Sequence, residues 1–151
     1  MKIYYGKAVY GKEEVQASLN VLKKKSLSLI DGPSVKKLEN LIAKTFGKKF
    51  GLMVNSGSSA NLLGLASLQL KKGSEVITPT LTFSTTVAPI YQLGLVPHFI
   101  DVGPNNFVAK IEQIEKAINK KTRAIIIPNL LGNVPDWGKI HKISKKYKLK
   151  V

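Results

Sequence analysis

From Phe50 onward, short apolar runs alternate with longer segments of helical spacing. The apolar runs occupy residues 50–54, 75–79, 96–102 and 123–128, and "LKV" at 149–151 begins a fifth. Helical patterns lie between them at about 58–70, 83–93, 110–119 and 137–147. Continuously apolar strands separated by helices are typical of a parallel sheet that is covered on both faces. The sequence therefore predicts an α/β fold, with a mostly parallel sheet flanked by helices on both faces and right-handed crossovers.

Two further helices are predicted before this alternation begins. Residues 11–25 place Val15, Leu19 and Leu22 at helical spacing, with acids early and lysines late. After a Gly-Pro break, Ser34 is the predicted N-cap of a second amphipathic helix that stops at Gly47.

Composition excludes several classes of protein. The chain has no cysteine and only two histidines, so we expect no disulfide framework, no thiolate chemistry and no metal site. No apolar run approaches the roughly 18 residues of a membrane helix, and the N-terminus lacks the apolar region of a secretory signal. The default expectation is a cytoplasmic protein without a membrane partner.

The net charge of +15 raises the question of anionic partners. Arg123 is the only arginine, whereas readers of bases and phosphates tend to use arginine forks, and the lysines are spread along the chain. We therefore interpret the charge as solvated lysine faces and do not expect nucleic acid as the partner. A basic nucleic-acid-binding α/β module remains the alternative function.

Three familiar motifs fail on inspection. The run "GKAVYGK" at 6–12 matches part of a phosphate-binding P-loop, but Glu13 stands where a magnesium-binding Ser or Thr is needed. The nucleophile elbow GxSxG fails because Asn61 follows Ala60, and no GxGxxG dinucleotide fingerprint occurs.

One stretch passes this test, the turn Ser56-Gly57-Ser58-Ser59. It joins an apolar run to a helical one, which would place free backbone N–H groups at the carboxyl end of a parallel strand, where α/β sheets bind anions. An ordinary serine N-cap with a glycine turn explains the same residues. The turn alone leaves both interpretations open.

The order of motifs around this turn resembles the DegT/DnrJ/EryC1/StrS family of pyridoxal-phosphate (PLP) enzymes, which act on nucleotide-linked keto sugars. The resemblance covers nearly the whole chain. The family's VNSGT-like turn, its GDEVI-P-FTF-AT segment, its G-P-FVDV strand and its KAI-PVH-YG segment are similar to residues 54–58, 73–86, 94–102 and 123–132.

The resemblance implies a fold and a set of cofactor contacts. It implies the N-terminal portion of the large domain of a fold-type I PLP-dependent transferase, with residues 1–33 as an arm and helix and 34–151 as an incomplete PLP-binding domain. The phosphate of PLP or pyridoxamine phosphate (PMP) would be bound by Ser56, Gly57, Ser58 and Ser59. Phe83 would stack on the cofactor ring, although core burial is the favoured explanation of a phenylalanine taken without the resemblance. Thr85 and Thr86 are candidate polar contacts, and Asn129 stands where the family usually has histidine.

The resemblance also bears on the reaction. The segments "PNLLGN" and "TPTLTFSTTVAP" look more like the branch of hexulose 3-dehydrases, in which a histidine replaces the Schiff-base lysine, than like the aminotransferases. That residue would lie beyond 151, so we expect no catalytic residue within this span and an inactive polypeptide when it is taken alone. The implied partners are a nucleotide-linked 4-keto-6-deoxy sugar, a second copy of the protein in a homodimer and, for a 3-dehydrase, a reductase. The implied setting is deoxy- or amino-sugar and surface polysaccharide biosynthesis.

The remaining polar and aromatic residues have plainer explanations. We expect His98 to be a packed or edge imidazole within a strand and Asp101 to act in a turn or cap. Trp137 is expected to pack at the start of the last helix, and His141 to face solvent.

Overall fold

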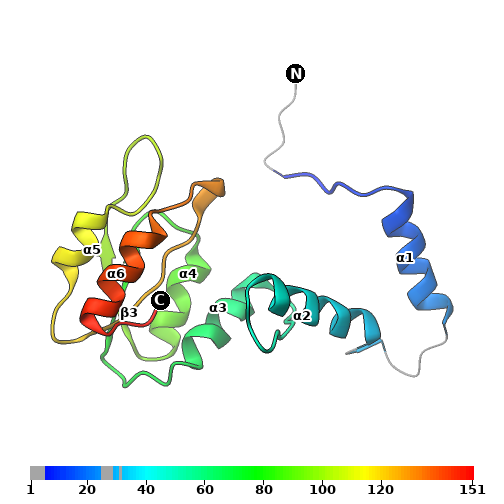
Figure 1. The fold of residues 1–151 in the computed structure, drawn as a ribbon, viewed down its shortest axis with the longest axis horizontal. Helices are drawn as coiled ribbons and strands as arrows, with labels where there is room; N and C mark the ends of the chain where they lie inside the picture. The colour runs from blue at the N-terminus through cyan, green and yellow to red at the C-terminus, as the bar shows by residue number, and fades with distance from the viewer. Residues whose placement is uncertain (1–5, 25–28, 31) are drawn as a thin grey trace. The chain divides into compact units, whose positions relative to one another are not determined.

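The computed structural model describes residues 6–24, 29–30 and 32–151. Its contacts divide the chain into two compact units, residues 1–53 and 54–151, which are treated separately here (Figure 1). The sequence analysis divides the chain between residues 33 and 34, into an arm and a PLP-binding domain, because the family resemblance implies those roles. That division stays a prediction. Part of the expected N-terminal arm (1–5, 25–28 and 31) lies outside the described residues.

The first unit contains α1 (Lys12–Lys23) and α2 (Pro33–Thr45). Gly11 is the N-cap of α1, and its N–H donates to the Glu14 carboxylate at 2.7 Å. This bond lowers the pKa of Glu14. Because residues 7–11 form no strand and the Gly11 donor is already used, the P-loop-like run has neither the context nor the free N–H groups of a phosphate loop.

The boundaries of α2 correct one prediction. Gly32, not Ser34, is the N-cap, because Pro33 occupies the first helical position, where its fixed φ fits and its missing N–H costs nothing. The predicted stop at Gly47 is confirmed: its φ is +60°, and the N–H of Lys48 donates back to Ala43 O at 2.7 Å.

The apolar run at 50–54 is not a strand, contrary to the prediction. Within the described residues it has no neighbouring strand, and a strand is stable only with a ladder partner. Instead, the N–H of Met53 donates to the Glu39 carboxylate at 2.8 Å, and Leu52 remains 78% exposed.

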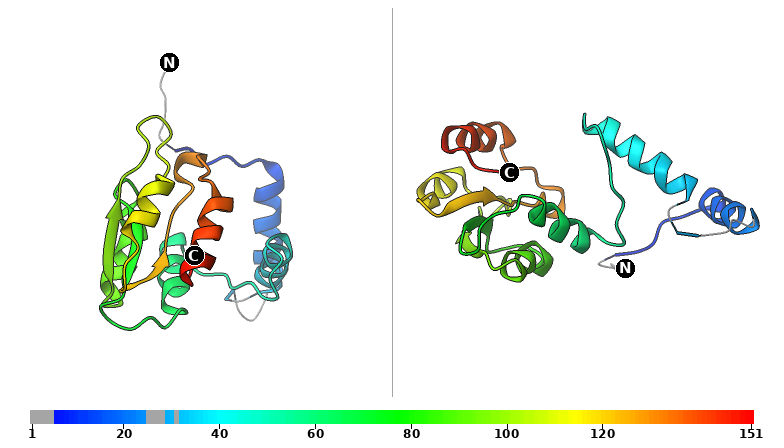
Figure 2. Two further views of the ribbon diagram at one scale, coloured as in Figure 1. Left: turned by 60° about the vertical axis from the view of Figure 1, so that its left-hand side comes forward. Right: turned by 90° about the horizontal axis from the view of Figure 1, so that it is seen from below.

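The second unit is a parallel sheet with helices on both faces, as predicted. Strands β1 (Glu75–Pro79), β2 (Val96–Ile100) and β3 (Thr122–Ile125) lie in the order β2-β1-β3. A parallel bridge between Ala124 and Lys150 adds the start of the expected further strand. The four helices are α3 (Gly57–Ala66), α4 (Ser84–Gln92), α5 (Ile111–Ala117) and α6 (Trp137–Tyr147). Figure 2 shows α3 and α4 on one face of the sheet and α5 and α6 on the other.

Side chains of β1 divide the core between these two faces. Ile77 packs with Ile114 of α5 and Ile140 of α6, and all three are fully buried. Val76 points to the opposite face and packs with Leu65 of α3 and Ile90 of α4. This alternation is the period of two expected of a strand that is covered on both faces.

Gly94, in the turn before β2, provides a test of backbone conformation. Its φ is +68°, and a Cβ there would meet Lys72 Cγ at 3.2 Å. We expect Gly94→Ala to destabilise the intact protein by about 1–2 kcal/mol in urea unfolding, because an L-residue pays for the left-handed conformation. Gly64, inside α3 with open space around its Cβ position, is the matched control. Gly64→Ala is expected to stabilise by about 0.5–1 kcal/mol, and equal effects at both positions would contradict this account.

Candidate functional site

The N-terminus of α3 presents hydrogen-bond donors to its surroundings. Ser56 is the N-cap, and its Oγ accepts from the Ser59 N–H at 3.1 Å, while its carbonyl accepts from the Ala60 N–H at 3.1 Å. Across the described residues, the N–H groups of Gly57 and Ser58 have no recorded partner. The serine cap predicted as the plain explanation is therefore present, and it leaves two donors unused. Cap and anion site are compatible in the same turn.

Space is open around these donors. A Cβ built on Gly57 meets no atom within 4 Å, and its φ is not in the left-handed region, so neither sterics nor conformation within this chain requires glycine there. Ser58 is exposed and Ser59 half-buried, with the Ser59 hydroxyl 3.1 Å from Ser56 Oγ. A glycine without a structural requirement is consistent with close approach of a ligand to the backbone.

The N-terminus of α4 supplies the aromatic side chain. Phe83 is its N-cap residue, and the Phe83 carbonyl accepts from the Thr86 N–H at 2.9 Å. The Phe83 side chain is 67% exposed, so core burial does not explain it. Thr86 is buried instead, and its hydroxyl accepts from Thr82 Oγ1 at 2.9 Å. Thr82 and Thr86 thus stabilise the first turn of α4, while the Phe83 ring is free to contact a ligand.

A side chain that the sequence analysis missed joins the two helix N-termini. Asn61 Nδ2 of α3 donates to the Thr85 carbonyl of α4 at 3.2 Å. Since α4 follows the carboxyl end of β1 after a short turn, both N-termini lie at the carboxyl edge of the sheet. Asn61 is a single amide within an otherwise apolar helical run, and that is the signal that could have identified it.

A small pocket of about 170 Å³ lies between the same two helices. It is lined by Ser58, Ser59 and Leu62 of α3 and by Thr85, Ala88, Pro89 and Gln92 of α4. The predicted residues Ser58, Ser59 and Thr85 therefore line one hollow.

Asn129 lies after β3, at the start of a short 3₁₀ helix (Leu130–Gly132). It is exposed, and its Oδ1 accepts from Trp137 Nε1 at 3.2 Å. Trp137 also packs against the core at the start of α6, as expected, and His141 is exposed. Asn129 thus shares the carboxyl edge with the α3 turn, but its amide oxygen already has a partner.

The turns of the carboxyl edge carry no cationic side chain, but Lys110 and Lys139 flank them, and Lys139 Nζ is paired with Asp136 at 3.1 Å. We define this edge as residues 55–58, 80–83, 101–109 and 126–136, which contain no Lys or Arg and two acids. Asp101 Oδ1 accepts from the Val102 N–H at 2.9 Å, which is the turn role expected for it. Asp136 caps α6 by accepting from the Lys139 N–H at 3.0 Å, and that bond lowers the pKa of Asp136. An anion at this edge would therefore be held by backbone N–H and hydroxyl groups.

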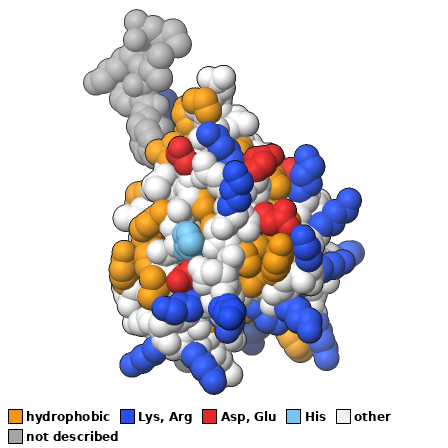
Figure 3. Space-filling view, turned by 90° about the vertical axis from the view of Figure 1, so that its left-hand side faces the viewer, with side chains coloured by type: hydrophobic (Ala, Val, Ile, Leu, Met, Phe, Trp, Pro, Cys, Tyr) orange, Lys and Arg blue, Asp and Glu red, His pale blue; other side chains and the backbone are white. Residues whose placement is uncertain are grey.

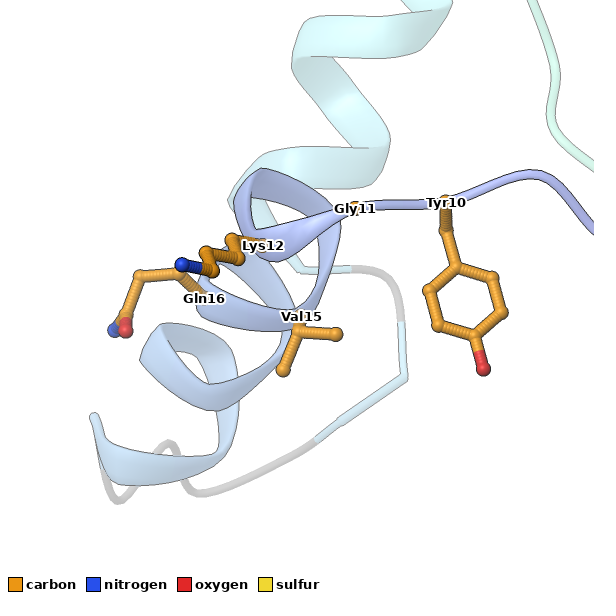
Figure 4. A pocket seen from close by; sticks show the side chains of 5 residues that line it. All are labelled: Tyr10, Gly11, Lys12, Val15 and Gln16. Carbon is orange, nitrogen blue, oxygen red and sulfur yellow. The ribbon is translucent and has the colours of Figure 1, made fainter.

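A larger hollow lies on the first unit but lacks converging polar groups. Tyr10, Gly11, Lys12, Val15 and Gln16 line it, and their side chains diverge (Figure 4). The Gly11 N–H is already bonded to Glu14.

Among the described residues, no group of His, Asp and Glu could hold a metal ion, and no helix is long and apolar enough to cross a membrane.

His98 belongs to a polar cluster at the opposite, amino edge of the sheet. Its Nδ1 lies 3.0 Å from Glu75 Oε2, which also accepts from Asn119 Nδ2 at 2.6 Å. The bond from Asn119 first, and then the one from His98, holds the pKa of Glu75 below its usual value. His98 is thus a packed edge imidazole, as predicted.

This cluster makes stability depend on pH. Because the pKa of Glu75 is lowered by folding, its contribution is fully present above its unfolded pKa and is lost as pH falls through the folded value. We expect Glu75→Gln to reduce the loss of stability between about pH 7 and about pH 3.5, measured by urea unfolding of the intact protein. An unchanged acid-induced loss in the variant would show that Glu75 does not contribute.

The parallel sheet with helices on both faces defines the second unit as a member of the α/β class, in which ligands bind at the carboxyl edge of the sheet. The family is defined more closely by comparison. Residues 9–151 match the model of the DegT/DnrJ/EryC1/StrS aminotransferase family, and the chain belongs to this family. The resemblance found in the sequence is thereby confirmed.

Similar proteins include both enzyme types that the sequence suggested. The chain is 42% identical to the GDP-4-keto-6-deoxy-D-mannose 3-dehydratase of Escherichia coli O55:H7, over 86% of this chain and 34% of that protein. It is 33% identical to the 3-oxo-glucose-6-phosphate:glutamate aminotransferase of Bacillus subtilis, over 92% of this chain and 32% of that protein. The chain thus spans about a third of the length of these curated relatives.

A solved structure shows the same fold. The E. coli GDP-4-keto-6-deoxy-D-mannose-3-dehydratase with bound hydrated PLP superposes with a TM-score of 0.86 at 38% identity, over 95% of this chain and 38% of that one. The similarity confirms that the parallel α/β architecture is that of PLP-dependent enzymes.

Proposed function

We propose that the α3 turn binds the phosphate of PLP or PMP. The observation that carries the proposal is the pair of unused N–H donors on Gly57 and Ser58, at a helix N-terminus where a Cβ on Gly57 would meet no atom within 4 Å. The residues present fit a phosphate, because the Ser58 and Ser59 hydroxyls add donors and the helix dipole favours an anion. The PLP bound in a similar solved structure supports this choice of ligand.

The other predicted residues receive roles around the cofactor ring. The exposed Phe83 side chain would pack on one face of the ring, since it is fixed to the first turn of α4. Thr85 and Asn129 are proposed polar contacts at the same sheet edge. When bound, the cofactor would supply an electron sink for bond cleavage next to its attached substrate. The residues of this chain bind and orient it, and none of them is assigned a proton transfer.

For the intact protein we propose an enzyme that acts on a nucleotide-linked 4-keto-6-deoxy sugar. The 3-dehydratase reaction is favoured over transamination, because identity is 42% to the dehydratase and 33% to the aminotransferase. In this proposal residues 34–151 contribute to the large PLP-binding domain and residues 1–33 form an arm. The proposed partners are a second copy of the protein and, for the dehydratase, a reductase.

Two measurements test this function. The intact protein is incubated with PLP, and the visible absorption that survives gel filtration is recorded. It is then supplied with glutamate and a nucleotide-linked 4-keto-6-deoxy sugar. Retained cofactor with a 3-deoxy product supports the dehydratase, an amino sugar shows the aminotransferase, and failure to retain PLP contradicts the cofactor site.

The coding sequence after residue 151 provides an independent test. A lysine in the position of the cofactor-linked residue would favour the aminotransferase, and a histidine would favour the dehydratase. The absence of both would contradict the proposed enzyme.

A further inference from the structure

The second unit has a strong asymmetry of charge between the two edges of its sheet. Exposed cations gather at the amino edge, in the turns that precede the strands; the amino-edge cations are Lys71, Lys72, Lys120, Lys121, Arg123, Lys148 and Lys150. Figure 3 shows Lys and Arg side chains along the lower part of the face and also on its right-hand side. The turns of the carboxyl edge, by contrast, contain no Lys or Arg and are flanked by two lysines, Lys110 and Lys139.

Hydrogen bonds join these turns into one surface. The Gly73 N–H donates to Gly94 O at 2.8 Å, and the Glu75 N–H donates to Lys121 O at 2.9 Å. The Lys150 N–H donates to Arg123 O at 3.0 Å. The turns that carry these cations, although far apart in sequence, therefore lie along the same edge of the sheet.

The acid at this edge offsets little of the cationic charge: the bonds from Asn119 and His98 lower the pKa of Glu75 most, and Lys121 adds only a smaller effect. The Glu75 carboxylate is engaged by Asn119 and His98. In the part of the chain that the structure describes, no ion pair involves an amino-edge cation; the recorded pairs of lysine belong to Lys139 and Lys146.

Neither lysine-rich composition nor helix capping explains the pattern. Uniform enrichment would place similar numbers of lysines at both edges, whereas only Lys110 and Lys139 flank the carboxyl edge, and Lys139 is paired with Asp136. The helix dipole accounts for lysines in a last turn, such as Lys145 and Lys146 of α6, which are outside this set. The amino-edge cations thus form a surface that these two effects leave unexplained.

We propose that this edge docks the protein on an anionic lipid bilayer. Lysines are point charges that suit a diffuse, laterally mobile array of headgroups, whereas ordered phosphates favour arginine forks, and Arg123 is the only arginine. The turns at 71–74, 94–96, 120–123 and 148–151 contain no aromatic residue on which bases could stack. Half-exposed Val96 lies among the lysines, at a position to contact the headgroup boundary. The docked protein would keep its carboxyl edge away from the bilayer.

Vesicle co-sedimentation of the intact protein tests this proposal, independently of the cofactor. Vesicles of phosphatidylcholine with about 30% phosphatidylglycerol are compared with pure phosphatidylcholine, at about 0.1 M and about 0.5 M salt. We expect binding only to the anionic vesicles and its loss at high salt. No binding at low salt would overturn the proposal.

A charge-matched pair of variants locates the surface. The edge variant combines Lys72→Gln, Lys121→Gln, Lys148→Gln and Lys150→Gln; the control combines Lys36→Gln, Lys37→Gln, Lys44→Gln and Lys48→Gln in and after α2. At about fivefold per lysine, the edge variant should bind on the order of several hundred-fold more weakly, and the control should bind like the wild type. Thermal unfolding verifies that both variants are folded. Equal losses of vesicle binding in both variants would overturn the proposal. It would also be overturned if the wild type bound duplex DNA more strongly than vesicles and only the edge variant lost that DNA binding.

Discussion

Gly57→Asp is expected to leave the protein folded and to abolish retention of PLP. A side chain at position 57 has open space, and an acid in the first turn of α3 interacts favourably with the helix dipole, by about 0.3–1 kcal/mol. The same carboxylate would occupy the space in front of the unused N–H donors and repel the phosphate. Repulsion between charges about 4 Å apart is worth several kcal/mol near a protein surface, so we expect affinity for PLP to fall by about 100-fold or more.

Gly57→Asn is the matched control, because asparagine has nearly the size of aspartate but no charge. We expect it to weaken PLP binding far less than Gly57→Asp does. Affinity is measured by titration of each apoprotein with PLP, and unfolding in urea shows whether the fold is intact. Equal losses in both variants would indicate obstruction by size, and full retention in Gly57→Asp would place the phosphate elsewhere.

Most of the lysines of the second unit lie far from the α3 turn, so they do not serve as its phosphate-binding groups. Under the proposed function, a surplus of lysines could be expected to capture an anionic substrate. Most of the cations of the second unit, however, lie at the amino edge, at the opposite end of the strands, and the carboxyl-edge turns are flanked only by Lys110 and Lys139. Neutralisation of a phosphate at the α3 turn therefore depends on N–H and hydroxyl groups within this chain. Any cationic side chain at that site would have to come from outside the carboxyl-edge segments.

Periodicity was sufficient to predict the elements that bury a core. β1, β2 and the four helices of the second unit fall where the apolar pattern placed them, because burial decides both periods. The helices α1 and α2 also form in their predicted segments, although α1 buries no residue and α2 buries only Ala43. Residues 50–54 have the same apolar pattern but no strand beside them, and composition cannot reveal a missing ladder partner. The position of the Ser56–Ser59 turn at a helix N-terminus was also predictable, because a serine cap and a glycine have local signatures.

Contacts between distant residues were not predictable in the same way. The bond from Asn61 to the Thr85 carbonyl spans 24 residues, and that from Asn119 to Glu75 spans 44. Neither has a periodic or local signature, since each depends on which helix the fold places beside which turn. The exposure of the Phe83 side chain was likewise not predictable, because its sequence context fits a core residue as well as a ligand contact.

Ile77→Ala is expected to be among the most destabilising single changes in the second unit. Ile77 is fully buried in the central strand, paired with His98 on one side and Ile125 on the other. Its side chain fills the core between β1 and the helices α5 and α6. Removing it leaves a cavity that the rigid sheet cannot close, at a cost of about 2–5 kcal/mol, a large part of the roughly 5–15 kcal/mol that stabilises a typical domain.

Two further variants separate the cavity from other effects of substitution. Ile77→Val removes one methylene and should cost about 0.5–1.5 kcal/mol, so the loss should increase with the volume removed. Val96→Ala shortens a half-exposed side chain on the edge strand β2 and should cost less than about 1 kcal/mol, because little buried surface is lost. The urea midpoint of the intact protein should therefore be highest for Val96→Ala, lower for Ile77→Val and lowest for Ile77→Ala. A similar midpoint for Ile77→Ala and Val96→Ala would mean that the face between β1, α5 and α6 is not a packed core in solution.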